Sequence, residues 1–146
     1  MFPISIEGQF ELPQGDFAHV DAALTSMQDA LTAVRASTVS RDGNAVTYTA
    51  SLWRFVTNWN ILAPVPTGRI EIQPGMPGVV TFRFSTILLL MLGTAGATFI
   101  AAAAGQDGHL GFGLVVFAVG WLWLFGMNYL IAYLRLRAFV RRSVLE

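Results

Sequence analysis

Two long apolar runs without a charged residue constrain the fold of this 146-residue chain more than any other feature. The first run extends from Ser85 to Gly105, and the second extends from Leu110 to Leu134. About 20 apolar residues in a helix cross the roughly 30 Å hydrocarbon core of a bilayer, and a longer run can cross it at a tilt. The sequence therefore predicts two transmembrane helices, at 85–105 and 110–134.

A short polar segment, Gln106 to His109, separates the two runs. A connection of this length requires the two helices to lie antiparallel, so we expect a helical hairpin. The first run begins far from the N-terminus, and residues 1–4 have neither the basic nor the apolar region of a signal peptide. We therefore expect the hairpin to remain in the mature protein.

The basic residues near the ends of the runs predict an orientation. Arg69 and Arg83 precede the first run, four arginines follow the second, and the connecting segment has none. Cytoplasmic segments carry the excess of basic residues in membrane proteins. We therefore expect a multi-pass protein with two spans in a bacterial inner (plasma) membrane, with both termini cytoplasmic.

Residues 1–84 have the patterns of a small α+β domain. Apolar and polar residues alternate from Ile4 to Leu12, as in a half-buried strand. Asp16 stands where it can cap a helix that has apolar residues at spacings of three and four as far as Val34. The opposite side of this helix is polar, which is typical of a helix that lies on a sheet.

Four further strands follow in two predicted hairpins. An Asp-Gly turn at residues 42–44 joins 38–41 to 45–51, and a Pro- and Gly-rich turn joins 69–73 to 79–84. We expect an α+β fold in which a small N-terminal antiparallel sheet is covered by one amphipathic helix and followed by the two-helix transmembrane hairpin. The predicted divisions are a cytoplasmic membrane-proximal domain at 1–84, the hairpin at 85–134 and a basic cytoplasmic tail at 135–146.

An aromatic segment between the two strand hairpins allows three interpretations. Trp53, Phe55 and Trp59 could extend a strand and complete the core, rest at the membrane interface, where Trp is enriched, or contact a partner. We take these residues as candidate membrane-interface residues. No linker separates Phe84 from Ser85, so the domain is expected to be held against the membrane.

Small residues recur every four positions in the first span. Gly93, Ala97 and Ala101 would form one smooth helix face that another helix can approach closely, either within the hairpin or in another subunit. Asn128 is strongly polar and lies in the second span, where it can form a hydrogen bond within the hairpin or with a partner. We take these four residues as candidate helix-packing residues.

The predicted tail mixes basic and apolar residues just beyond the second span. Arg135, Arg137, Arg141 and Arg142 would set the orientation and contact anionic lipid, since each basic residue near such a surface contributes about 1 kcal/mol. Alternatively, they would dock on an acidic partner surface.

The sequence contains no recognisable reaction centre. It has no cysteine, which excludes disulfides and thiolate metal sites, and its two histidines have no second ligand at a suitable spacing. The carboxylates are scattered over positions predicted to face solvent. We therefore expect no catalytic, cofactor-binding or metal-binding residue and no cofactor. Equal numbers of basic and acidic residues, nine each, also exclude the positive footprint of a nucleic-acid-binding protein.

These observations favour a non-enzymatic integral membrane protein that acts as an accessory or scaffolding subunit of a bacterial inner-membrane complex. Its expected partners are the lipid bilayer and other membrane-protein subunits, or further copies of itself. The alternative is a homo-oligomeric channel or ligand sensor whose cytoplasmic domain gates the helix hairpins. An enzyme acting on lipid would instead require a pocket near Trp53–Trp59 with a carboxylate of raised pKa.

Overall fold

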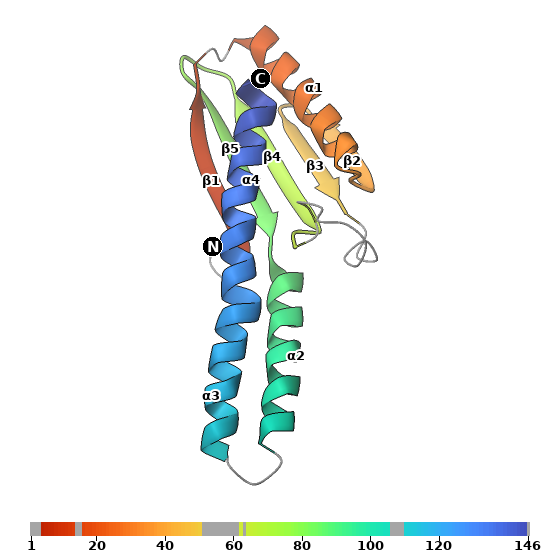
Figure 1. The fold of residues 1–146 in the computed structure, drawn as a ribbon. Helices are drawn as coiled ribbons and strands as arrows, with labels where there is room; N and C mark the ends of the chain where they lie inside the picture. The colour runs from red at the N-terminus through yellow and green to blue at the C-terminus, as the bar shows by residue number, and fades with distance from the viewer. Residues whose placement is uncertain (1–3, 14–15, 51–61, 63, 106–109, 146) are drawn as a thin grey trace.

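The computed structural model describes residues 4–13, 16–50, 62, 64–105 and 110–145, and its fold is shown in Figure 1. It confirms the α+β class, with an antiparallel sheet near the N-terminus and a pair of long apolar helices after it. The elements are β1 (Ser5–Leu12), α1 (Phe17–Ala33), β2 (Thr38–Asp42), β3 (Ala45–Thr49), β4 (Thr67–Gln73), β5 (Gly78–Ser85), α2 (Ile87–Ala104), α3 (Leu110–Trp121), the π-helix η2 (Leu122–Met127) and α4 (Asn128–Leu145).

The five strands form one antiparallel sheet in the order β1-β5-β4-β3-β2. The first strand therefore pairs with the last, and Ser5 lies opposite Ser85. In the β2–β3 turn, Gly43 has a φ of 55°, a left-handed conformation that favours glycine. The predicted Asp-Gly hairpin is thus confirmed.

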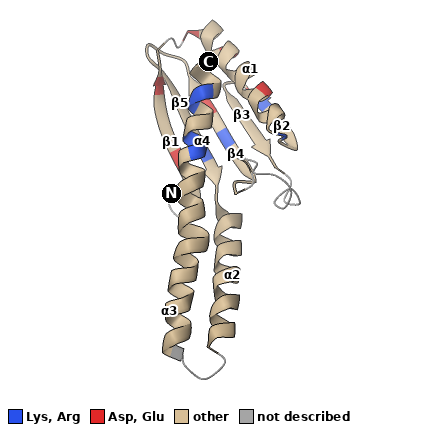
Figure 2. Ribbon diagram, in the orientation of Figure 1, with Lys and Arg blue, Asp and Glu red and all other residues tan. Residues whose placement is uncertain are grey.

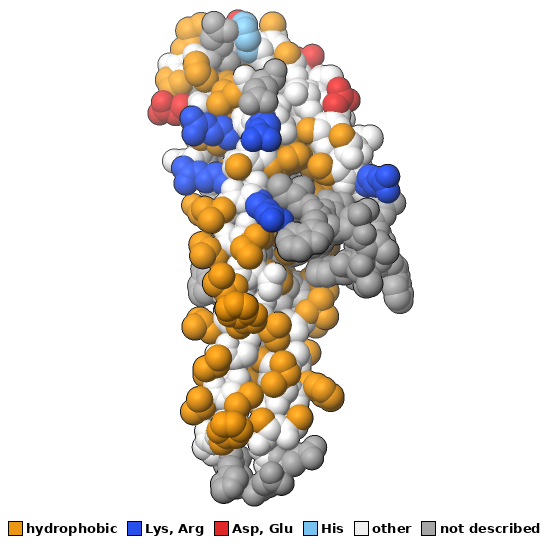
Figure 3. Space-filling model, in the orientation of Figure 1, with side chains coloured by type: hydrophobic (Ala, Val, Ile, Leu, Met, Phe, Trp, Pro, Cys, Tyr) orange, Lys and Arg blue, Asp and Glu red, His pale blue; other side chains and the backbone are white. Residues whose placement is uncertain are grey.

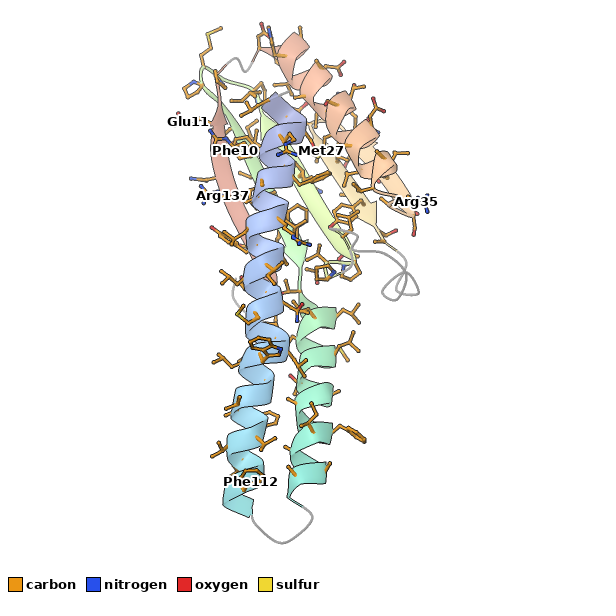
Figure 4. All side chains as sticks on the ribbon, in the orientation of Figure 1. Phe10, Glu11, Met27, Arg35, Phe112 and Arg137 are labelled. Atoms are coloured by element: carbon orange, nitrogen blue, oxygen red, sulfur yellow. The ribbon has the colours of Figure 1, made fainter. Side chains whose placement is uncertain are left out.

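Side chains alternate between the two faces of a sheet, and here the buried apolar residues of the strands lie on one face. Helix α1 packs on this face, and its N-terminus is capped by Asp16, whose Oδ1 accepts a hydrogen bond of 2.8 Å from the His19 amide. Met27 of α1 lies between this helix and α4 (Figure 4). The core comprises Ile6, Leu12, Val20, Ala23, Leu24, Met27, Leu31, Val46, Tyr48, Leu62, Val65, Ile70, Ile72, Val80, Phe82, Phe84, Ala132, Leu136, Val140 and Val144.

A second helix, α4, lies on the same face of the sheet beside α1 (Figure 1). The sequence predicted that the second span ends at residue 134 and that a basic tail follows, but α4 continues through this boundary to Leu145. Leu136, Val140 and Val144 recur every four residues and are buried in the core. The residues expected to form a separate tail are therefore part of the domain.

The other half of the molecule is the hairpin of α2 against α3 and η2. The apolar windows of α2 and of residues 111–145 are long and apolar enough to cross a membrane, and only 17% and 6% of their residues are buried. Hydrophobic side chains accordingly cover the surface of this half (Figure 3), an apolar patch that soluble proteins rarely expose to water. The charged residues that are described lie in the half that holds the sheet (Figure 2).

Candidate functional site

The predicted small-residue face packs inside the hairpin. Gly93 and Ala97 are buried, and a Cβ added to Gly93 would lie 3.0 Å from the Cβ of Phe125 in η2. Further along, a Cβ on Gly120 would lie 3.8 Å from the Cβ of Ala97. Ala101 is half-buried. Of the two interpretations of this face, the structure therefore shows the contact within one chain.

A hydrogen bond that the sequence analysis missed also joins the two spans. The indole Nε1 of Trp121 donates to Thr94 Oγ1 at 3.0 Å. Thr94 directly follows Gly93, so the bond lies beside the contact of Gly93 with Phe125. The sequence does show a hydroxyl residue, Thr94, next to the small-residue face. Its partner Trp121 could not be identified, because that requires the rotation of one helix relative to the other.

The π-helix η2 lies where the second span meets Gly93. Phe125 is fully buried, with its ring centroid 4.9 Å from that of Trp121 and 5.7 Å from that of Tyr129. A π-helix turn is rare and occurs frequently at functional sites. Here it places Phe125 against Gly93, and no residue pattern in the sequence predicted it.

Asn128 follows η2 and lies outside the seam between the helices. Its side chain is exposed, and its Nδ2 donates to the carbonyl oxygen of Leu124, one turn earlier, at 2.7 Å. The predicted hydrogen bond is therefore made within its own helix. The amide is a polar group on the outer surface of a mostly apolar hairpin.

The hairpin and the sheet are joined at three points. Strand β5 is followed by α2 after one buried residue, Thr86, whose amide donates to Ile4 O at 2.9 Å. The hydroxyl of Tyr129 on α4 donates to Ser5 O at 3.2 Å, and the rest of α4 packs in the core. The predicted junction without a linker is thus present, and α4 reinforces it.

The four predicted arginines, Arg135, Arg137, Arg141 and Arg142, are exposed on α4. Arg137 projects on the side of α4 away from α1 (Figure 4), and basic side chains lie above the apolar half in Figure 3. Part of this surface, here called the α4 face, lines a shallow hollow of about 430 Å³. Its residues are Leu134, Arg137, Ala138, Arg141, Arg142 and Leu145.

The sheet face opposite to α1 and α4 is polar. Arg83 pairs with Glu7 across the sheet, with Nε 3.1 Å from Oε1, and Arg69 pairs with Glu71, with Nη2 3.5 Å from Oε2. All four side chains are at least 39% exposed, so these ion pairs contribute little to stability. This face is called the outer face below.

Two described groups with shifted pKa values, Tyr48 and Asp16, do not share a pocket. Burial raises the pKa of Tyr48, whose hydroxyl donates to Val65 O at 3.0 Å. Hydrogen bonds from the backbone and side chain of His19 lower the pKa of Asp16, which is exposed on the opposite side of the domain. Among the described residues, no group of three or more His, Cys, Asp or Glu side chains could hold a metal ion.

The aromatic candidates Trp53, Phe55 and Trp59 lie outside the described residues. Comparison with protein-family models, with curated proteins and with solved structures finds no match to this chain.

Proposed function

We propose that the chain is a non-enzymatic accessory or scaffolding subunit of a bacterial inner-membrane complex, with both termini in the cytoplasm. The observation that supports this most is the attachment of the domain to the hairpin. Thr86 is buried between β5 and α2, and α4 passes from the hairpin into the core without interruption. A domain joined to the hairpin at these points cannot swing away from the membrane, so the subunit could hold a partner at a fixed distance from the bilayer.

The surfaces of the domain support a role in binding a partner. The outer face carries no described helix, and the α4 face combines Arg137 and Arg141 with the exposed apolar residues Leu134 and Leu145. A basic surface with apolar ends matches an acidic, amphipathic segment of a partner, because complementary charge gives specificity and speeds association. We infer that the α4 face is the contact surface.

The proposal is tested by the native mass of the affinity-tagged protein, expressed at its own level and extracted in native nanodiscs. Foreign subunits at fixed stoichiometry are the expected result. A single species at a multiple of 15.9 kDa would favour the self-assembled alternative. A monomer without partners would contradict both functions.

The contact surface is tested by reversing its charge. The Arg137→Glu/Arg141→Glu variant should lose the co-purifying subunits, because an acidic partner would meet like charge. Asp29→Arg is the matched control, since Asp29 is exposed on α1, away from the α4 face. Equal retention of partners by the two variants would show that the α4 face is not the contact surface.

One observation favours the alternative, a homo-oligomeric channel or ligand sensor. Asn128 exposes an amide on the outer surface of the hairpin, where contact with the same residue of a second copy would satisfy it. Interhelical hydrogen bonds of this kind contribute about 0.5–2 kcal/mol in membranes. Self-association would therefore use the surface around Asn128, since Ala97 is fully buried within one chain.

The alternative predicts different results for two substitutions. Asn128→Leu should reduce the native mass to that of one chain if the hairpins associate through this amide, and Leu130→Ala, at an exposed position two residues away, should leave it unchanged. An Asn128→Leu variant with the native mass of the wild type would contradict association through Asn128.

A further inference from the structure

Two arginines lie directly opposite each other on the outer face. The register of β4 and β5 pairs Arg69 with Arg83. Side chains at such positions have Cβ atoms about 4.5–5.5 Å apart, and like charges placed there destabilise a sheet. Each arginine is also ion paired with a carboxylate, Arg83 with Glu7 and Arg69 with Glu71, but more than half of each arginine side chain stays exposed to a further anion.

Of the two carboxylates near this pair, Glu71 lies farther from the hairpin than the arginines, and Glu7 lies beside Arg83 on the neighbouring strand β1. Glu7 and Glu71 line a hollow of about 510 Å³ together with the two arginines. A second hollow of about 440 Å³ lies on the side toward the hairpin, and no carboxylate is among the described residues that line it. Arg69 and Arg83 line both hollows and therefore form the boundary between them.

The lining of the second hollow has the chemistry of a phosphate site. Besides the two arginines, the hydroxyl residues Thr49, Thr67 and Ser85 line it. Guanidinium groups bind phosphate oxygens through charge-assisted, often bidentate hydrogen bonds. Both arginine side chains are more than half exposed and can reach an anion.

The second hollow also adjoins the start of the membrane span. Ile87, the first residue of α2, lines it and is 50% exposed. Arg83 precedes Ile87 by four residues, at most about 13 Å of extended chain. The headgroup layer extends about 5–8 Å beyond the hydrocarbon core, and arginine side chains reach toward it from above. From this position the two arginine side chains can reach the layer of lipid phosphates.

We propose that Arg69 and Arg83 bind the phosphate of an anionic phospholipid from the leaflet beside the domain. Ile4 and Ile87 are exposed at the rim of the same hollow and contact the acyl chains of that lipid. A free phosphate ion has no apolar part that could contact these two side chains. The lipid fixes the domain against the membrane on the outer face, whereas α4 fixes it on the inner face.

The test measures lipid binding to the full-length chain in detergent by native mass spectrometry. Wild type, Arg69→Gln/Arg83→Gln and the control Arg35→Gln/Arg41→Gln, at exposed positions outside the second hollow, are titrated with phosphatidylglycerol and with phosphatidylcholine. The two variants lose the same charge, but only the first loses it from the proposed site. The first variant should keep the thermal midpoint of the wild type, because the two ion pairs that it loses are exposed and contribute little to stability. An unchanged midpoint will show that this variant is folded.

Wild type should bind phosphatidylglycerol in preference to phosphatidylcholine. The Arg69→Gln/Arg83→Gln variant should lose about thirtyfold in affinity for phosphatidylglycerol, since each basic residue at an anionic surface contributes about a factor of five. The control variant should remain within about twofold, because distant exposed charges are screened. Equal losses, or a loss in the control variant only, would overturn the proposal.

Millimolar inorganic phosphate distinguishes lipid from a free anion. It should not displace phosphatidylglycerol from the wild type, because phosphate makes no contact with Ile4 or Ile87. Complete displacement would show a site for soluble anions and would overturn the lipid assignment. These results do not depend on whether the chain is a subunit of a complex, so this proposal and the proposed function can fail separately.

Discussion

At the scale of single residues, two glycines on the inner face of the sheet make room for aromatic rings. Gly8 lies opposite Phe82 and Gly68 lies opposite Phe84. A Cβ built on either glycine would overlap the ring across from it. The phenylalanines thereby cover backbone that glycine leaves open, and they complete the core above it.

Adding one methyl group at Gly8 should therefore destabilise the domain. Gly8→Ala should lower the free energy of unfolding by about 1–3 kcal/mol, because the Phe82 ring must move within a packed core. The change is measured as the shift in thermal midpoint of the detergent-solubilised protein. Gly111→Ala is the control, since an added Cβ there would have no atom within 4 Å. Equal shifts would show that the ring adapts without cost.

The cap residue of α1 predicts a pH dependence. The pKa of Asp16 is lowered from its ordinary value of 3.8 by hydrogen bonds from His19. A carboxylate with a lowered pKa stabilises the fold above the unfolded-state value, and this stabilisation disappears as the pH falls through the folded-state value. Asp16→Asn should therefore melt below wild type at pH 7, and the difference should shrink as the pH falls below 3.8 and vanish below the lowered folded-state pKa.

The control for this substitution is Asp29→Asn, on the exposed side of the same helix. It should melt as the wild type does at pH 7, because Asp29 is not at the helix cap. A gap between wild type and Asp16→Asn that persists at acidic pH would show that the ionised carboxylate is not the cause.

At the scale of elements, α4 is the helix on which the architecture depends most. Its first turns belong to the hairpin, where Leu130 and Ile131 are exposed for contact with lipid, and its last turns lie on the sheet. The first turns of α4 therefore need apolar side chains around the whole helix, whereas its last turns need them only on the side that faces the sheet. Its arginines begin where the second condition applies.

Two leucines of α4 separate these roles. Leu136 is fully buried in the core, whereas Leu134 is 58% exposed. Leu136→Ala should lower the free energy of unfolding by about 2–5 kcal/mol, because it leaves a cavity between α4 and the sheet. Leu134→Ala should change it by less than about 0.5 kcal/mol. Thermal unfolding in one detergent measures both, and similar shifts would mean that α4 does not dock on the sheet.

At the scale of the whole molecule, the described charges lie at one end and the apolar surface lies at the other (Figures 2 and 3). A chain with this division has one stable placement in a bilayer, with the domain outside the hydrocarbon core. The excess of arginine near the domain further predicts that the domain is cytoplasmic.

Cysteine labelling tests this orientation, and the chain has no cysteine of its own to interfere. A membrane-impermeant thiol reagent added to intact cells should label Gln106→Cys, between α2 and α3. It should label Asp29→Cys, on the exposed side of α1, only after permeabilisation. The reverse pattern would place the domain outside the cell and would contradict the proposed location.

Most of the elements could be predicted from the sequence, because the signals that define them are local. Alternation from Ile4 to Leu12, the Asp-Gly turn before Asn44 and the uncharged run after Arg83 each involve neighbouring residues. Such patterns determine which segments are strands, turns and membrane spans. The small-residue face of α2 was also identifiable, although its packing partner was not.

Tertiary structure decided how these elements meet. The pairing of Arg69 with Arg83, the contact of Phe125 with Gly93 and the docking of Leu136 in the core each join residues that are distant in sequence. The charges from 135 to 142 obscured the four-residue spacing that buries one side of α4. Local periodicity shows which side of an element is apolar, but which surface covers it depends on the register and rotation of elements that only the folded chain brings together.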